Sequence, residues 1–519
     1  MWCVRLPFAD SVGKPFCFLL SILYCCIVLP GCSGNRGKVR TVADLSDFEH
    51  RTVPAYRLQG DRVRRAVDSL SREPQRMYAD AYVRRYYASR GSFLWITRNG
   101  VERQADSLLA MLESMPEEGI PLPCFSAEDI KEDIRRVREL DFGRGNDINT
   151  VFGRLEYRLT KALLRYACGQ HYGYVRPDRI LNHLEPADTM PDAPFKRLYA
   201  IPTEQADEAF VRHVLQALQS GRLPAFLREI QPQNSEFFLL AGAFRTETDP
   251  KKKERIAVNM ERCRWRTPRP AGKHVRVNLA AMSLVALNPD KGDTLRMKVC
   301  GGDLKHKSPM LVSKIERMDL NPYWIVPYSI IKKEIAPLHA QSVAYFSRNN
   351  IRIFDKETGA EADPADVTAA MLTTGRYRLR QDNGQGNSLG RLIFRFPNEF
   401  SVFLHDTNNK AAFGRTNRAI SHGCIRVEKP LELALFLWET DDEEAIDRLR
   451  TEIGLPALHA GRKKTDGDET PKADSRHFDV PIPVFIDYYT AIPALRGGVD
   501  FYPDIYGYDE VLLESLKAY

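Results

Sequence analysis

The chain has 519 residues, of which 43% are hydrophobic and 28% are charged. This ordinary globular composition argues against a fibrous or disordered chain, and the length allows two or three domains with their own cores. The net charge of +7 is spread over the sequence. It therefore indicates only a mild preference for anionic surfaces, and a lipid headgroup would fit as well as nucleic acid.

The first predicted element is an apolar run at residues 16–29, which follows Arg5 and Lys14. The run is too short to span a bilayer comfortably, so we predict a signal peptide over residues 1–32. Its ending, Leu-Pro-Gly-Cys, resembles a bacterial lipobox in which Cys32 becomes the lipidated first residue, although Pro30 is unusual there. Cleavage nearby without a lipid and an uncleaved membrane anchor are the alternatives.

Residues 33–250 have helical periods and few strand signals, so we predict a mostly helical scaffold with no catalytic residues. Residues 108–112 suit one helix face. A second helix is predicted from apolar residues at three- and four-residue steps, namely Phe152, Leu155, Leu159, Ala162 and Tyr166. Gly169 follows them and is predicted to be the C-terminal cap.

After Trp265 the pattern changes to short strands, so we predict an α+β protein whose second domain, residues 251–519, is a mainly β sandwich or half-barrel. Leu295, Met297 and Val299 alternate with polar residues, and Asn-Pro-Asp-Lys-Gly at 288–292 predicts a hairpin turn. Further strands are predicted at 274–279, 392–396, 401–404 and 484–489.

Three segments interrupt or follow these strands. Residues 321–363, with Tyr328 and a short helix at 332–334, are interpreted as a helical and loop cap over a site, although simple aromatic packing would also explain them. Pro430 opens a helix, and Thr440 with Glu443 has the spacing of a capping box for the next one. The charged residues 461–474 predict a mobile surface loop.

A thiol, two imidazoles and a guanidinium occur close together in Ser-His-Gly-Cys-Ile-Arg (421–426) and His-Asp-Thr (405–407). A cysteine of ordinary pKa is mostly protonated at neutral pH, so a nucleophilic thiol needs a base or cation, which His405 or His422 would supply. The Gly423 and Cys424 amides can approach a substrate oxygen closely, as an oxyanion site requires. Arg426 adds a forked donor that keeps its proton. The segment predicts a cysteine enzyme.

The other cysteines support this assignment. Five of the 10 lie in the leader, which leaves an odd number downstream and implies at least one free thiol in an exported protein. Cys424 is the natural candidate. Cys168 and Cys263 fall on apolar helix faces, where inert buried thiols are expected.

A zinc site is the main competing interpretation, because His405, Asp406, His422 and Cys424 are all possible ligands. No second cysteine lies nearby, and Arg426 would place a cation beside the metal. Arg426 also has a plainer interpretation as an ion-pair partner of Glu428 or Asp406.

A histidine followed after fifteen residues by Ser-His-Gly-Cys resembles the signature of the L,D-transpeptidases with a YkuD-type catalytic domain. The resemblance implies that Cys424 is the nucleophile and His405 its base, with the Asp406 carbonyl holding the other ring nitrogen. His422 and Ser421 would be supporting residues. Gly423 and Arg426 would then belong to the oxyanion site and to substrate binding.

The resemblance extends over residues 252–508, to the large Gram-negative branch of that family. Matching segments are 255–262, 321–327 with Tyr323 and Trp324, 394–407 and 504–508. Arg380 and Gln381 resemble a substrate-side segment. Asn408 departs from the usual proline, and the peptidoglycan-binding module that this branch commonly inserts is not recognisable between residues 201 and 252. Substrate capture would then depend on the cap and the scaffold.

The function implied by the resemblance is formation of 3→3 cross-links in peptidoglycan. Cys424 would attack a tetrapeptide stem at the carbonyl on the L-centre of diaminopimelate, D-Ala would leave, and the side-chain amine of an acceptor stem would resolve the acyl-enzyme. No cofactor and no nucleic acid are implied, and carbapenems are expected to be covalent inhibitors. With the leader, this predicts a periplasmic lipoprotein of a Gram-negative bacterium, held in a membrane through Cys32.

Two alternatives remain open at this point. Water as the acceptor would make the protein an L,D-carboxypeptidase that uses the same residues. A non-catalytic lipoprotein that binds the cell wall is the alternative from another class, but binding alone requires no thiol.

Overall fold

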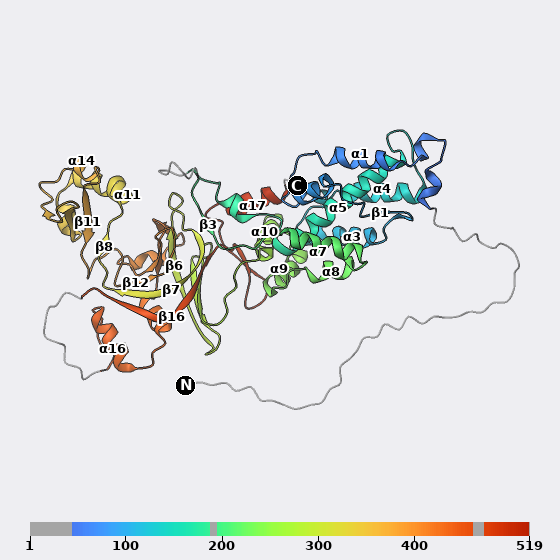
Figure 1. Cartoon of the computed structure of the whole chain (residues 1–519). Coiled ribbons are helices and arrows are strands. Elements are labelled where there is room, and N and C mark those ends of the chain that lie inside the picture. The colour runs from blue at the N-terminus through green and yellow to red at the C-terminus, as the bar shows by residue number, and fades with distance from the viewer. Residues whose placement is uncertain (1–43, 187–194, 460–471, 518–519) are drawn as a thin grey trace, which may run out of the picture. The chain divides into compact units, whose positions relative to one another are not determined.

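The computed structural model describes residues 44–186, 195–459 and 472–517. The predicted leader with Cys32, and residues 461–471 of the predicted mobile loop, lie outside these ranges. The chain has a helical N-terminal region and a sheet-rich C-terminal region (Figure 1), so the predicted α+β class is confirmed. Within the described ranges, every helix is too short or too polar to cross a bilayer.

The N-terminal region is built around one long helix, α5 (Ile148–Tyr172), whose residues are mostly buried. Its Glu156 carboxylate accepts hydrogen bonds from the backbone amides of Leu94, Trp95 and Ile96. The neighbouring elements are α1 (Gly60–Leu70), α2 (Asp80–Ala88), β1 (Ile96–Thr97), β2 (Gly100–Val101), α3 (Gln104–Glu113), α4 (Ala127–Glu139), α6 (Pro177–Leu181), α7 (Glu208–Gln219), α8 (Leu223–Glu229) and α9 (Ser235–Thr246).

The predicted end of α5 is wrong by one helical turn. Gly169 lies inside the helix, and Gly173, with φ of 93°, is the capping residue. A Cβ on Gly169 would lie 2.0 Å from the Tyr174 ring, so this glycine allows an aromatic side chain to pack against the helix. Gly169 therefore serves packing inside the helix, and the helix ends at the next glycine, Gly173.

Helix α10 (Pro250–Arg264) precedes the sheet and carries an unusual number of buried polar side chains. Asn259 Nδ2 donates to Thr490 Oγ1 at 2.7 Å, and Arg262 pairs with Asp509 at 2.7 Å. On the scaffold side, Arg264 pairs with Glu118 at 2.8 Å. The helix therefore bonds to elements from both ends of the chain.

The central sheet has the strand order β12-β13-β15-β6-β5-β4-β16-β7-β3, with β14 paired to β6. Because β12 also pairs with β7, the sheet curls back on itself, as expected for a sandwich or half-barrel. Its strands are β3 (Tyr199–Ala200), β4 (His274–Asn278), β5 (Ser283–Asn288), β6 (Asp293–Gly302), β7 (Met310–Leu320), β12 (Leu392–Arg395), β13 (Leu404–His405), β14 (Ala419–Ser421), β15 (Ile425–Val427) and β16 (Asp474–Asp487). The predicted hairpin at 288–292 joins β5 to β6.

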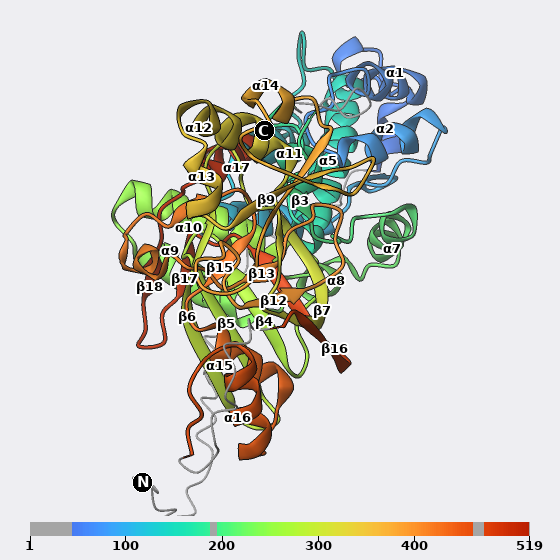
Figure 2. The ribbon, with the colours of Figure 1, turned by 90° about the vertical axis from the view of Figure 1, so that its left-hand side faces the viewer.

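A second, smaller core lies in the cap, apart from the main one. Its sheet has the order β10-β9-β11-β8, and helices α11–α14 gather beside β9 (Figure 2). The elements are β8 (Trp324–Ile325), α11 (Tyr328–Ile330), a π-helical turn (Ile331–Ile335), α12 (Ala336–Gln341), α13 (Ala344–Arg348), β9 (Ile351–Asp355), β10 (Glu361–Ala362), α14 (Ala369–Leu372) and β11 (Tyr377–Gln381).

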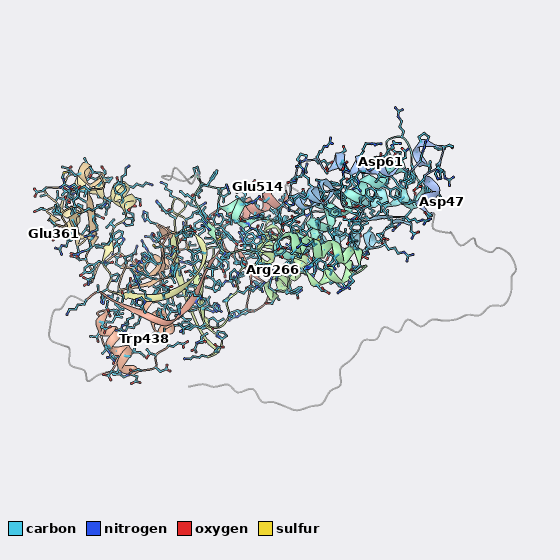
Figure 3. The ribbon with its side chains drawn as sticks, in the orientation of Figure 1. Asp47, Asp61, Arg266, Glu361, Trp438 and Glu514 are labelled. Carbon is cyan, nitrogen blue, oxygen red and sulfur yellow. The ribbon has the colours of Figure 1, made fainter. Side chains whose placement is uncertain are left out.

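Helix α15 (Pro430–Trp438) begins at Pro430 as predicted and ends at Trp438 (Figure 3). The next helix, α16 (Glu443–Glu452), is capped by Asp442, whose carboxylate accepts the Glu444 amide, and the predicted Thr440 cap is wrong. Thr440 instead accepts a hydrogen bond from the Asp442 amide. Towards the C-terminus follow β17 (Ala491–Pro493), β18 (Val499–Phe501) and α17 (Tyr508–Lys517), and short 3₁₀ helices lie at Leu45–Phe48, Pro54–Tyr56, Met115–Glu118, Leu122–Phe125 and Lys410–Gly414.

Candidate active site

Strands β13 and β15 bring the two predicted catalytic segments together. They pair in parallel, with His405 opposite Arg426. Cys424 comes directly before β15, in a turn between β14 and β15. The sequence suggests a loop that runs from Cys424 to the helix at Pro430, but strand β15 lies between Cys424 and α15. The thiol, the imidazole and the guanidinium therefore lie on adjacent strands, with Cys424 two positions before the residue that pairs with His405.

Cys424 is half-buried, whereas the other four described cysteines are buried, and none of the five forms a disulfide. Its Sγ lies 3.9 Å from the Ser401 carbonyl oxygen. Burial raises the pKa of the Cys424 thiol, and the Phe403 amide and the guanidiniums of Arg395 and Arg426 oppose that rise. The residue keeps part of its surface exposed, although protein encloses most of it.

His405 is buried, and its environment favours the neutral ring. Burial and the nearby Arg426 charge lower the His405 pKa to about 4, although the Asp406 and Leu389 carbonyls favour protonation. Nδ1 has no hydrogen-bond partner, so the Asp406 carbonyl lies near the ring without closing a hydrogen bond to it. An imidazole of this kind is unprotonated at neutral pH and free to accept a proton.

The turn that holds Cys424 is fixed by its own side chains. Ser421 Oγ donates to the Cys424 carbonyl at 2.5 Å and accepts the Gly423 amide at 3.2 Å. Gly423 has φ of 108°, a conformation that favours glycine. Because the Gly423 amide already bonds Ser421, a substrate oxygen would compete with that hydroxyl.

A chain of hydrogen bonds supports this turn from the C-terminal tail. Ser308 Oγ donates to the Gly423 carbonyl at 2.7 Å, and the Ser308 amide donates to Tyr506 Oη at 3.2 Å. Tyr506 Oη in turn donates to the Gly302 carbonyl at 2.7 Å. The tail segment 504–508, which the sequence singled out, therefore acts on the site through Ser308.

His422 links the turn to the cap. Its Nε2 lies 2.5 Å from Glu334 Oε1, in the π-helical turn Ile331–Ile335. Its ring centroid lies 4.6 Å from that of His306, and His306 Nδ1 lies 3.0 Å from Asp303 Oδ1. A carboxylate from the cap thus contacts the residue two positions before Cys424.

Arg426 and Asp406 have different surroundings. Arg426 Nε is buried without a hydrogen-bond partner, and burial lowers the Arg426 pKa. Among the described residues it forms no ion pair with Glu428 or Asp406. The Asp406 carboxylate instead accepts the amides of Thr407 and Arg391 and pairs with Lys410. Asp406 therefore organises the loops around the site.

The cap residues singled out in the sequence lie together on its sheet, where Arg380 pairs with Ile325 and Gln381 with Trp324. Arg380 lies over the Tyr323 ring at 4.6 Å and bonds Asp382. The Gln381 side chain is bonded to the backbone of residues 349, 386 and 388. Tyr323 is exposed and Trp324 half-buried, so the two aromatic residues and Arg380 offer the accessible surface.

The described residues contain no group of three or more His, Cys, Asp or Glu side chains placed to hold a metal ion. Sequence reasoning missed Glu334, His306, Ser308 and Arg395. Glu334 lies 88 residues from His422, and Ser308 lies 115 residues from Gly423. No local spacing could signal contacts over such distances.

Comparisons with known proteins agree with this geometry. Residues 272–442 match the L,D-transpeptidase catalytic domain of the YkuD family, and residues 81–243 match a family described as a scaffold domain. The chain is 27% identical over 358 residues to a protein of Haemophilus influenzae named "Putative L,D-transpeptidase", a match that covers 67% of this chain and 69% of that relative. Residues 272–442 therefore carry an L,D-transpeptidase catalytic domain of the YkuD type, and this domain supports a peptidoglycan-modifying enzyme.

Proposed function

We propose that the protein forms 3→3 cross-links in peptidoglycan through an acyl-enzyme on Cys424. The observation that carries this proposal is the partly exposed Cys424, which lies on the strand pair that also carries His405 and Arg426. The remaining described cysteines are buried, so they offer a peptide no comparable access.

In the first half-reaction, His405 takes the Cys424 proton as the sulfur attacks the carbonyl on the L-centre of diaminopimelate. The C–N bond to D-Ala breaks, and the proton held by His405 passes to the departing amine. Because burial disfavours charge on both side chains, the thiolate and imidazolium form together and stabilise each other only during attack. Arg426, which acts electrostatically on both groups, supports the developing negative charge.

In the second half-reaction, the side-chain amine of an acceptor stem attacks the thioester, and Cys424 leaves and recovers its proton. Hydrolysis by water, the L,D-carboxypeptidase reaction, competes at this step. The contact between His422 and Glu334 favours transfer to an amine, because a cap held against the catalytic turn restricts the entry of water. The same thiol would react with carbapenems.

We also propose that the protein is exported to the periplasm and held in a membrane by a lipid on Cys32. This rests on the leader sequence alone. Mass spectrometry of the mature N-terminus tests it: a lipid-modified Cys32 is the expected start, and an unmodified start downstream of Cys32 would eliminate the lipid.

Defined tetrapeptide muropeptides, incubated with the purified protein and separated by mass, test the reaction. We expect 3→3 dimers and free D-Ala from the wild type, and neither product from Cys424→Ala. The matched control is Cys300→Ala, which removes a buried thiol from the neighbouring strand β6. Free tripeptides without dimers would establish the carboxypeptidase instead, and D-Ala release by Cys424→Ala would rule out both.

A further inference from the structure

Two rows of side chains cross the central sheet from the candidate active site. In the first row, His405 lies opposite Arg426 on β15 and opposite Ile393 on β12. This row continues through Asp319 on β7 to Ser475 on β16. Because side chains alternate between the two faces of a strand, positions two residues along each strand share this face. They form the second row, which consists of Cys424, Phe403, Arg395, Arg317 and His477.

Both rows lie on one face of the sheet, the active face. The opposite face of the same strands belongs to the main hydrophobic core, with the buried residues Met318, Leu320, Leu392, Phe394, Leu404 and Ile425. On the active face, by contrast, the Arg395 side chain is 37% exposed and that of Arg317 is 40% exposed. The active face is therefore accessible along the row that contains Cys424.

Apart from its histidines and Cys424, the active face carries more positive than negative charge. The charged members of the two rows are Arg317, Arg395, Arg426 and Asp319. The Asp319 carboxylate pairs with Arg395 and, at 3.1 Å, with Arg317. It also accepts from Ser475 Oγ at 2.8 Å. One carboxylate thus serves two guanidiniums, and a second carboxylate would be electrostatically favoured beside them.

Arg395 has donors that the protein leaves available. Its Nε bonds Asp319, and its guanidinium lies over the Phe403 ring, 4.9 Å from the centroid. Among the residues that the structure describes, its two Nη atoms have no hydrogen-bond partner, and neither is a buried orphan. A guanidinium can bind a carboxylate through two parallel N–H···O bonds. Arg395 can therefore accept a carboxylate from outside the protein.

Arg395 also lies close enough to Cys424 to meet a peptide that the sulfur attacks. The two residues are two strands apart in the second row, and adjacent strands lie about 5 Å apart. The Arg395 guanidinium covers Phe403, which occupies the intervening position. The Arg395 charge opposes the rise in the pKa of Cys424, which is consistent with this proximity.

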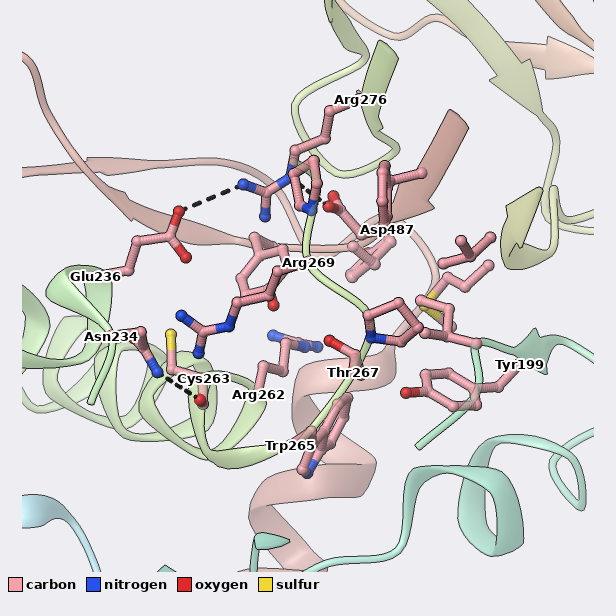
Figure 4. A pocket seen from close by; sticks show the side chains of 18 of the residues that line it. Tyr199, Asn234, Glu236, Arg262, Cys263, Trp265, Thr267, Arg269, Arg276 and Asp487 are labelled. Atoms are coloured by element: carbon pink, nitrogen blue, oxygen red, sulfur yellow. Dashed lines mark hydrogen bonds and ion pairs between the residues drawn. The ribbon is translucent and has the colours of Figure 1, made fainter. Parts of the chain in front are cut away.

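The pairing of Arg395 differs from that of Arg276, which lines a cavity away from the active face (Figure 4). That cavity measures about 290 Å³, and its lining includes no residue of the two rows. Arg276 Nε lies 2.5 Å from Asp487, and its Nη1 lies 3.3 Å from Glu236, so two carboxylates serve one guanidinium. The ratio is reversed on the active face, where two guanidiniums share the carboxylate of Asp319.

We propose that Arg395 binds a carboxylate of the donor stem and so determines which stems acylate Cys424. The Arg395 Nη atoms donate to the two carboxylate oxygens, while Nε stays with Asp319. A tetrapeptide stem carries carboxylates on D-Ala, on the D-centre of diaminopimelate and on isoglutamate. All three lie within roughly 10 Å of the attacked carbonyl, because each is at most one residue away from it. This inference rests on the acyl transfer proposed for Cys424 and adds a specificity-determining residue to it.

Release of D-Ala from four donor stems tests the inference. One stem is the native tetrapeptide, and each of the others has a carboxamide in place of one carboxylate. We expect one of the three amides to lower kcat/KM of the wild type about tenfold or more, because a charge-assisted pair is lost. Arg395→Met should show a similar loss on the native stem, and should process that amide as well as the native stem. If Arg395→Met does not fold, Arg395→Gln, which keeps a donor for Asp319, takes its place.

Two results would overturn the inference alone. One is wild-type kcat/KM on the native stem in the Arg395 variant. The other is discrimination among the four stems that is equal in the variant and the wild type. Absence of D-Ala release by the wild type from any stem would instead refute the function proposed above, and this inference with it. The matched control, Arg138→Met, removes an exposed, ion-paired arginine of α4 and should discriminate as the wild type does.

Alkylation by iodoacetamide distinguishes stem binding from an effect on the thiol, because this reagent has no carboxylate. We expect Cys424 of Arg395→Met to react within about threefold of the wild-type rate, since Arg426 and the Phe403 amide still act on the sulfur. A loss of about tenfold or more in this rate would assign Arg395 to the thiol and would contradict the proposal.

Discussion

Burial favours the neutral form of both Cys424 and His405. Burial raises the pKa of the thiol, and burial with Arg426 lowers that of the imidazole to about 4. The resting site therefore holds a protonated thiol and a neutral imidazole, and in the proposed reaction charge develops only when a substrate is attacked. The sequence identified both residues because their spacing is distinctive, but it could not give these environments, which depend on side chains from other strands.

The lowered pKa of His405 makes the stability of the protein depend on pH. Between about pH 6.5 and 4 the unfolded chain binds a proton at this position and the folded chain does not, so the free energy of unfolding falls as pH falls. The shift from 6.5 to about 4 corresponds to about 3 kcal/mol from this residue. We expect His405→Asn to lose that part of the pH dependence in urea unfolding at pH 7.5 and 4.5.

The control for this prediction is His50→Asn, at an exposed position on the scaffold, which should leave the pH dependence as in the wild type. The opposite outcome is that His405→Asn loses as much stability between pH 7.5 and 4.5 as the wild type does. That result would contradict a lowered pKa of His405 in the folded protein.

Elements were predictable where a local signal is unambiguous. The turn residues at 288–292 predicted the hairpin between β5 and β6, and Pro430 predicted the start of α15. Ends with two competing signals were not predictable: α5 passes Gly169 and ends at Gly173, and α16 is capped by Asp442. The predicted strand at 401–404 is reduced to β13 (Leu404–His405), because the backbone at Ser401 has φ of 55°.

The contact between the cap and the catalytic turn can be tested with a single substitution. Glu334→Ala removes the carboxylate that meets His422 at 2.5 Å. Both side chains of the pair are exposed by more than a third, so its loss should change the free energy of unfolding by only about 0–1 kcal/mol. We expect the fraction of donor stems that are hydrolysed to rise severalfold relative to cross-linked dimers, because the cap opens to water more often.

Glu357→Ala, at an exposed turn of the same cap, is the matched control and should leave the ratio of products unchanged. An unchanged ratio in Glu334→Ala as well would mean that the contact with His422 does not control the acceptor.

At the scale of the whole molecule, helix α10 joins the scaffold to the catalytic domain. Arg264 contacts Glu118 and Gln170 of the scaffold, while Arg262 and Asn259 contact the C-terminal segments. One hydrophobic core also includes residues from both regions. The sequence indicated two regions of different character, but it gave no sign of this shared core, because the contacts join segments far apart in the chain.

This arrangement predicts that the scaffold and the catalytic domain unfold in one transition. Arg264→Ala leaves Glu118 and the fully buried Glu261 without their cationic partner, and should lower the free energy of unfolding by about 3–5 kcal/mol. Arg266→Ala removes an exposed arginine two positions on (Figure 3), and should change it by less than about 0.5 kcal/mol. Separate transitions in denaturant, followed by circular dichroism and tryptophan fluorescence, would contradict a shared core.

The central claim, that Cys424 carries the acyl group, is tested most directly by the intact mass of the protein during turnover. A tetrapeptide donor without an acceptor should leave an adduct equal to the donor minus D-Ala, and peptide mapping should place it on Cys424. His405→Ala should abolish this adduct although its thiol is intact. Two results would contradict the account. One is an adduct on another residue. The other is release of D-Ala with no covalent species in a reaction that is quenched in acid within its first turnover.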